Sequence, residues 1–228
     1  MESKPKVHRI IIQILIILII LTALLFVPAG RLDWLQAWVL IFFILIYFLL
    51  YVQIGISKDP DQTRERSQMA KNVKPWDKVI MRIYTAILPT VFILAGLDAG
   101  RFRWSTVSMI WQLLAWIGLA FAGGIILWTV RSNTYLSRYA RIQDDRGQQV
   151  VATGPYRIIR HPMYLGILTL FLCMGPALGS WVVLFPGLLI DLLFVIRTGK
   201  EDKMLQEELD GYKQYSQVVR FRLIPWIW

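Results

Sequence analysis

The residues of this chain that could do chemistry gather in its last hundred positions, in two polar segments separated by an apolar stretch. The first segment contains the run Arg160-His161-Pro162-Met163-Tyr164. Proline fits the first position of a helix, where its missing N–H would be unpaired in any case. His161-Pro162 therefore predicts a helix start, and the free amides of its first turn could hold an anion such as a carboxylate. A capped membrane helix whose arginines reach the headgroups explains the same residues without a ligand.

The second polar segment follows the apolar stretch and has helical periodicity. Its members recur at steps of four and three residues: Arg197, Glu201, Leu205, Leu209 and Tyr212. This spacing places them on one helix face and predicts an amphipathic helix along the membrane interface. The simplest interpretation of Arg197 and Glu201 is an i,i+4 ion pair worth about 0.2–0.5 kcal/mol. Two histidines and one cysteine, Cys173, give zinc no plausible ligand set.

The elements that must position these residues are long apolar runs. The chain is 56% hydrophobic and 18% charged, whereas soluble domains are roughly 45–50% apolar and about 25% charged. A bilayer-spanning helix needs about 20 apolar residues. Four stretches meet this length, namely Ile10–Val27, Trp34–Ile56, Val79–Leu97 and Val107–Val130. The first is longer than a signal-peptide core and lacks a good cleavage site, so it is expected to be retained.

Two shorter apolar runs, Met163–Leu178 and Trp181–Ile196, are short for independent spans and flank a Gly179-Ser180 turn. We therefore expect an all-α polytopic membrane protein with four spanning helices, a C-terminal helical hairpin and an interfacial C-terminal helix. Residues 1–130 hold the spanning helices, and residues 131–228 hold the polar loop, the hairpin and the C-terminal segment. Asp191, an acid inside the hairpin, is either functional or paired with an arginine, and we favour the pairing.

The basic residues are distributed unevenly along the chain, which has 25 Lys and Arg against 15 Asp and Glu. They collect before the first span, between the second and third spans, and on both sides of the hairpin, whereas Arg31, Arg101 and Arg103 lie on the other side. The positive-inside rule then puts both termini and the polar segments in the cytoplasm. Membrane topology therefore explains the net positive charge. Nucleic-acid binding is not indicated, because the loops lack the interleaved aromatic and basic residues of a single-strand binding groove.

The order of motifs resembles the isoprenylcysteine carboxyl methyltransferases and their prokaryotic relatives over roughly residues 130–228. The resemblance rests on Gly154-Pro-Tyr156, Arg160-His161-Pro162-x-Tyr164-x-Gly166, an apolar hairpin, Arg197-x3-Glu201-Asp202-x2-Leu205 and Gly211-Tyr212-x2-Tyr215. The family usually has two glutamates where this chain has Glu201-Asp202. We therefore expect the shorter Asp202 to contribute less to ligand binding.

The resemblance implies methyl transfer from S-adenosylmethionine to a lipid-borne acceptor in a cytoplasmic pocket. By position, Arg197 would face the acceptor, and the residues lining the cofactor would be Val150, Val151, Tyr156, His161, Pro162, Met163, Tyr164 and Glu201. Arg197 and Glu201 are thus the expected catalytic pair. A carboxylate acceptor is ionised at neutral pH and needs no general base, so alignment and water exclusion suffice.

Other functions remain open from the sequence. The acceptor could be a prenylated cysteine carboxylate, a phospholipid amine or a small lipophilic metabolite. A nicotinamide-dependent sterol-type reductase has a similar Arg-His-Pro-x-Tyr run, but Met163 and Ile167 count against it. A non-catalytic membrane assembly protein could retain the fold. No residue predicts the oligomeric state.

The charge distribution makes a topology prediction. Cysteines introduced at Lys71 and Arg146 should resist an impermeant thiol reagent added outside intact cells, because both positions lie in loops predicted to be cytoplasmic. Permeabilised cells provide the positive control. Labelling of either cysteine in intact cells would contradict the predicted orientation.

Overall fold

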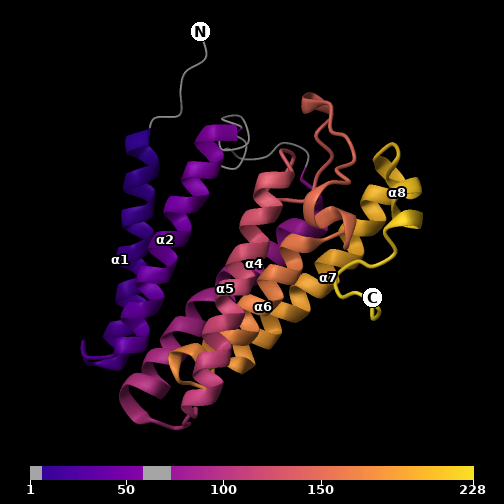
Figure 1. The fold of residues 1–228 in the computed structure, drawn as a ribbon. Helices are drawn as coiled ribbons and strands as arrows, with labels where there is room; N and C mark the ends of the chain where they lie inside the picture. Colours follow the sequence, from indigo (N-terminus) through magenta and orange to yellow (C-terminus); the bar gives the residue numbers. More distant parts are fainter. Residues whose placement is uncertain (1–6, 59–72) are drawn as a thin grey trace.

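The computed structural model describes residues 7–58 and 73–228, and within these residues all regular secondary structure is helical (Figure 1). The helices are α1 (Val7–Ala29), α2 (Leu35–Lys58), α4 (Pro75–Ala95), α5 (Met109–Ser132), α6 (Pro162–Leu178), α7 (Leu184–Glu208) and α8 (Tyr212–Val218). A π-helical segment, η1 (Gly96–Phe102), continues α4, and two short 3-10 turns are η2 (Asp144–Arg146) and η3 (Gly154–Arg157). The predicted all-α class is confirmed.

Among the described residues, four helices are long and apolar enough to cross a bilayer, as the sequence predicted. They are Ile10–Ala29, Leu35–Ile54, Pro75–Phe102 and Met109–Ser132. Figure 1 shows α1 and α2 standing beside a bundle of α4, α5, α6 and α7. The chain is an integral, multi-pass membrane protein. Position Lys71, used above for topology, lies outside the described residues.

The predicted hairpin is formed by α6 and α7, and its turn meets the connection between α4 and α5. Gly179 takes a positive φ of 88°, a conformation that glycine adopts without steric cost. Ser180 then donates a 2.5 Å hydrogen bond to Asp98 of η1, and the Trp181 amide donates to Ser105 Oγ. The hairpin therefore reaches as far through the bundle as α4 does. Helix α6 begins at the opposite end of the bundle from this turn, and we call that opposite end the site end.

The structure joins two elements that the sequence suggested were separate. α7 runs without a break from Leu184 to Glu208, about 38 Å at 1.5 Å per residue, so the polar face with Arg197 and Glu201 continues the second arm of the hairpin. Gly211, with a φ of 81°, separates α7 from α8. Tyr212 consequently belongs to a different helix from the rest of the predicted stripe.

Asp191 does not have the arginine partner that we expected. It lies on α7, is buried, and its Oδ1 has no hydrogen-bond partner among the described residues. The pairing was predicted from the cost of an isolated acid in an apolar run, but no arginine of the described chain lies within ion-pair distance.

Glycines allow unusually close approaches between helices of the bundle. A Cβ built on Gly96 would lie 2.4 Å from the backbone oxygen of Leu25 in α1, and one built on Gly118 would lie 2.3 Å from Sγ of Cys173 in α6. Small residues let membrane helices pack closely, and Gly118 of α5 allows such a contact with α6. Gly124 has no atom within 4 Å of a built Cβ.

The crowded position of Gly96 and the open position of Gly124 predict different outcomes for substitution by alanine. Gly96→Ala should lower the melting temperature in detergent, because backbone cannot move aside as a side chain can and overpacking costs about 1–3 kcal/mol. Gly124→Ala is the matched control and should be neutral or slightly stabilising, since alanine favours helix more than glycine. Equal melting temperatures for the two variants would show that α1 does not pack this closely on η1.

Candidate functional site

A cavity of about 540 Å³ opens at the site end of the bundle. Its wall combines α4, the loop between α5 and α6, the start of α6, and α7 and α8. The volume lies within the roughly 300–1,000 Å³ typical of small-molecule sites. Residues far apart in the sequence therefore meet around one pocket.

The loop between α5 and α6 covers the pocket because α4 holds it in place. Ala140 donates its amide to Asp77 Oδ2 at 2.7 Å, and its carbonyl accepts from the Lys74 amide at 3.2 Å. Further along, Val150 packs against the small cluster of Tyr212, Tyr215 and Val219. The loop thus joins α4 to α8 across the pocket.

Tyr164, near the start of α6, forms a polar contact with Glu201 of α7. The Tyr164 hydroxyl donates to Glu201 Oε2, and the Glu201 side chain is 22% exposed. The Tyr164 ring lies parallel to His161 at a centroid distance of 5.7 Å and tilts against Phe194 at 5.5 Å. A partly exposed carboxylate therefore faces the cavity beside an aromatic wall.

Arg197 is buried and already has a carboxylate partner. Its Nε lies 2.8 Å from Asp77 Oδ1, and its Nη2 donates to Asp77 Oδ2 and to the Arg138 carbonyl. The Nε–H does not point at Oδ1, so this contact is an ion pair rather than a hydrogen bond. Glu201 lies farther away, at 4.0 Å from Nε. The expected i,i+4 pair of Arg197 with Glu201 is thus weaker than the contact of Arg197 with Asp77 of α4.

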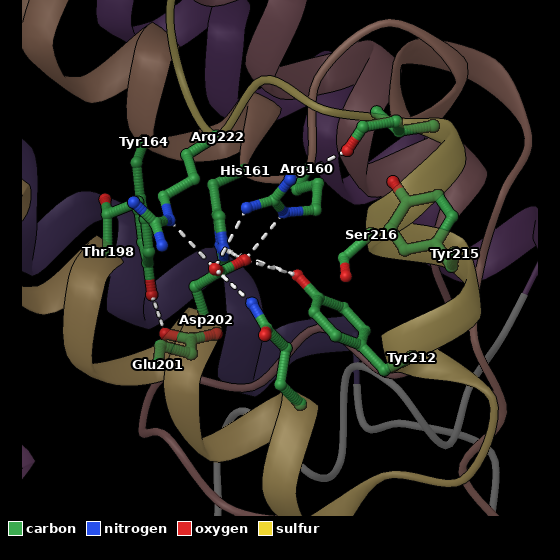
Figure 2. A network of polar contacts seen from close by, with 12 residues as sticks. Arg160, His161, Tyr164, Thr198, Glu201, Asp202, Tyr212, Tyr215, Ser216 and Arg222 are labelled. Atoms are coloured by element: carbon green, nitrogen blue, oxygen red, sulfur yellow. Dashed lines mark hydrogen bonds and ion pairs between the residues drawn. The ribbon is translucent and has the colours of Figure 1, made fainter. Parts of the chain in front are cut away.

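Asp202 is the centre of a buried network (Figure 2). Arg160 donates from Nε and Nη2 to its two oxygens at 2.7 and 3.0 Å, and Arg222 Nε donates at 2.8 Å. Its remaining neighbours are the Tyr212 hydroxyl at 3.0 Å, the Gln206 amide at 2.8 Å and His161 Nε2 at 3.2 Å. Asp202 itself is fully buried.

The charges around Asp202 keep it ionised. Burial alone would raise the pKa of this carboxyl, but the hydrogen bonds from His161, Arg160 and Arg222 hold its pKa well below the usual range. Burial, together with the Asp202 charge, raises the pKa of Tyr212. In this network an ionised carboxylate therefore accepts hydrogen bonds from two guanidinium groups and a neutral phenol.

Most of the residues expected from the sequence meet at this pocket. Its lining includes Val150, Val151, Tyr156, His161, Met163, Tyr164, Arg197 and Glu201. Pro162 is buried as the first residue of α6 and is not part of the lining. Asp77 was not predicted from the sequence, although its position as an acid at the start of an apolar span was a usable signal. Asp202 was predicted only as a shortened glutamate, whereas the structure makes it the centre of the network.

The fold and the site describe an all-helical, multi-pass membrane protein with a pocket at one end of its bundle. Residues 104–210 match the family model described as phospholipid methyltransferase. The matched segment begins just before α5 and ends after α7, so it contains Tyr164 and Glu201. No curated protein sequence matches the chain. The match supports a membrane methyltransferase of the superfamily that also includes the isoprenylcysteine carboxyl methyltransferases.

The Asp202 network makes a pH-dependent prediction. Asp202→Asn should lower stability by about 3–5 kcal/mol near neutral pH, since it leaves the buried guanidinium group of Arg160 without its anion. Because the folded-state pKa of Asp202 is depressed, its contribution is present above about pH 4 and is lost as the pH falls further. The stability difference from wild type should therefore shrink in acid.

Unfolding followed at several pH values in detergent measures this difference. Asp145→Asn is the control, because Asp145 is an exposed carboxyl that forms an ion pair with Arg141 of the same loop. A loss of stability in Asp202→Asn no greater than that in Asp145→Asn would contradict the central role of Asp202.

Proposed function

We propose that this chain is an S-adenosylmethionine-dependent methyltransferase that acts on a lipophilic acceptor at the membrane boundary. The observation that carries the proposal is the pocket at the site end, where Glu201 and aromatic side chains meet a wall that continues along α4 as Met81, Tyr84, Thr85 and Leu88. The phospholipid methyltransferase match over residues 104–210 supports the reaction class.

The residues present fit this cofactor by their chemistry. The amino group of the cofactor is cationic, and Glu201 offers a carboxylate bound by the Tyr164 hydroxyl. Aromatic rings attract a cationic sulfonium through their negative faces, and the lining contains Tyr135, Tyr139, Tyr156 and Tyr164. Val150 and Val151 supply apolar surface in the covering loop.

The bound cofactor would supply an activated methyl group on a cationic sulfur. The protein then has to align the acceptor with that methyl group and exclude water. Tyr164 positions Glu201, His161 stacks against Tyr164, and the loop held by Asp77 covers the pocket. The apolar face of α4 is suited to hold a hydrocarbon chain beside these groups.

Two acceptor groups suit the pocket through different residues. A carboxylate would use the guanidinium of Arg197, as the isoprenylcysteine resemblance implies, but it would have to compete with Asp77 for that cation. An amine would have to lose a proton, and Glu201 is the carboxylate in the lining that could accept it. The phospholipid methyltransferase match favours the amine as the second candidate.

The experiment that tests the proposal also separates these acceptors. Membranes containing the overproduced protein are incubated with S-adenosylmethionine labelled in its methyl group, and the labelled lipid is isolated. Mild alkali releases volatile labelled methanol from a methyl ester, whereas an N-methyl group survives. Absence of labelling above membranes that lack the protein would contradict the proposed function.

Glu201 provides the sharpest prediction at the cofactor. Charge-assisted hydrogen bonds are worth about 1.5–3 kcal/mol, so Glu201→Gln should weaken binding of S-adenosylhomocysteine roughly ten- to a hundred-fold. Titration calorimetry in detergent measures this affinity. Glu207→Gln is the matched control on the same helix, because Glu207 is exposed and forms a surface ion pair with Lys203 at 3.7 Å.

Different results would support the competing functions. Unchanged affinity in Glu201→Gln would leave Glu201 only as a partner of Tyr164 and Arg197. Heat from a reduced nicotinamide cofactor, with none from S-adenosylhomocysteine, would favour the reductase. A folded protein that binds neither compound would favour the non-catalytic assembly protein.

A further inference from the structure

The segment after α8 exposes large apolar side chains at its tip. Trp226 is 88% exposed and Ile227 is 77% exposed, and Trp226 adopts a positive φ of 70°. The tip is nevertheless held in place, because the amides of Arg222, Leu223 and Ile224 all donate to the Trp228 backbone oxygen. An ordered turn that presents tryptophan and isoleucine outward is unfavourable in water.

Contacts with α7 place this turn at the membrane boundary. The exposed face of the apolar part of α7 ends at Ile196, after Phe185, Leu188 and Leu192. One turn farther along, a Cβ built on Gly199 would lie 4.0 Å from the ring of Trp228. Figure 1 shows the yellow tail descending from α8 alongside α7. The tip therefore lies at the level where α7 leaves the apolar layer.

The charge of the neighbouring segments complements a phospholipid surface. Residues 211–228 contain Lys213, Arg220 and Arg222 and no acidic residue. The segment before α6 adds exposed Arg157 and exposed Ile158. Basic residues beside exposed aromatic and aliphatic side chains are typical of surfaces that enter the headgroup region.

We propose that the turn with Trp226 and Ile227 inserts into the headgroup–acyl boundary of the leaflet at the site end. The occupant of this surface is the bilayer that the chain already spans. The turn buries its two exposed apolar side chains there, while Arg220 and Lys213 remain at the level of the lipid phosphates.

Insertion of this turn would anchor Arg160 and His161, which line the pocket just before α6, to the bilayer. The carbonyls of Phe221 and Arg222 accept hydrogen bonds from the amides of Arg160 and His161, both at 2.9 Å. The Arg222 side chain also donates to Asp202. The tail is therefore the direct link between the leaflet and the start of α6.

Spin labels can measure the depth of the turn. In a Cys173→Ser background, Ile227→Cys is labelled with a nitroxide, and the protein is reconstituted in liposomes of phosphatidylcholine and phosphatidylglycerol. Collisions with oxygen, which concentrates in lipid, are compared with collisions with a water-soluble nickel chelate. Leu192→Cys on the exposed face of α7 is the lipid reference, and Glu207→Cys, eight residues beyond Gly199, is the water reference.

The expected result is an Ile227 label with high oxygen and low nickel accessibility, within about 5–10 Å of the headgroups. Nickel accessibility equal to that at Glu207 would overturn the proposal. Protection from both probes would also overturn it, because a protein surface such as a second copy would then cover the turn. None of these outcomes depends on methyltransferase activity, so the test stands apart from the proposed function.

Discussion

The carboxylate of Asp202 holds together the parts of the chain that surround the pocket. It binds the side chain of Arg160 just before α6, Tyr212 at the start of α8 and Arg222 in the tail, and it belongs itself to α7. A carboxylate has about four lone-pair sites, so these donors, together with Gln206 and His161, leave none of them unused. A single buried anion therefore determines how the start of the hairpin, the end of α7 and the C-terminal segment sit relative to one another.

Because of helix geometry, the adjacent acids Glu201 and Asp202 of α7 contact different groups. Successive residues of an α-helix point about 100° apart because a turn contains 3.6 residues. Asp202 points into the network with Arg160 and Arg222, whereas Glu201 lies beside Tyr164 (Figure 2). The shorter side chain of Asp202 is then no defect, since aspartate holds its carboxylate close to the helix where the two arginines converge.

The sequence was sufficient for elements that depend on local composition. Apolar length predicted the four spans, and Gly179 marked the turn of the hairpin. It could not show that Arg197 pairs with Asp77, because the two lie 120 residues apart and only tertiary packing brings them together. Polar composition after Ile196 also hid the continuity of α7, since helical hydrogen bonding persists after the apolar layer ends. The site lining was largely predicted from motif order, whereas the partners of each charged side chain were not.

The buried ion pair of Asp77 and Arg197 explains how the pocket can be polar at one end and apolar at the other. A lone guanidinium beside the apolar face of α4 would be strongly disfavoured, but a paired one presents little net charge. Asp77 sits in the first turn of α4, so the neutralising group is carried by the same helix that lines the cavity with Met81 and Leu88. A hydrophobic chain could thus lie along α4 without facing an unpaired cation, while the pocket retains the Glu201 carboxylate at its polar end. This division into an apolar and a polar end supports the proposal of a lipophilic acceptor that carries a polar group.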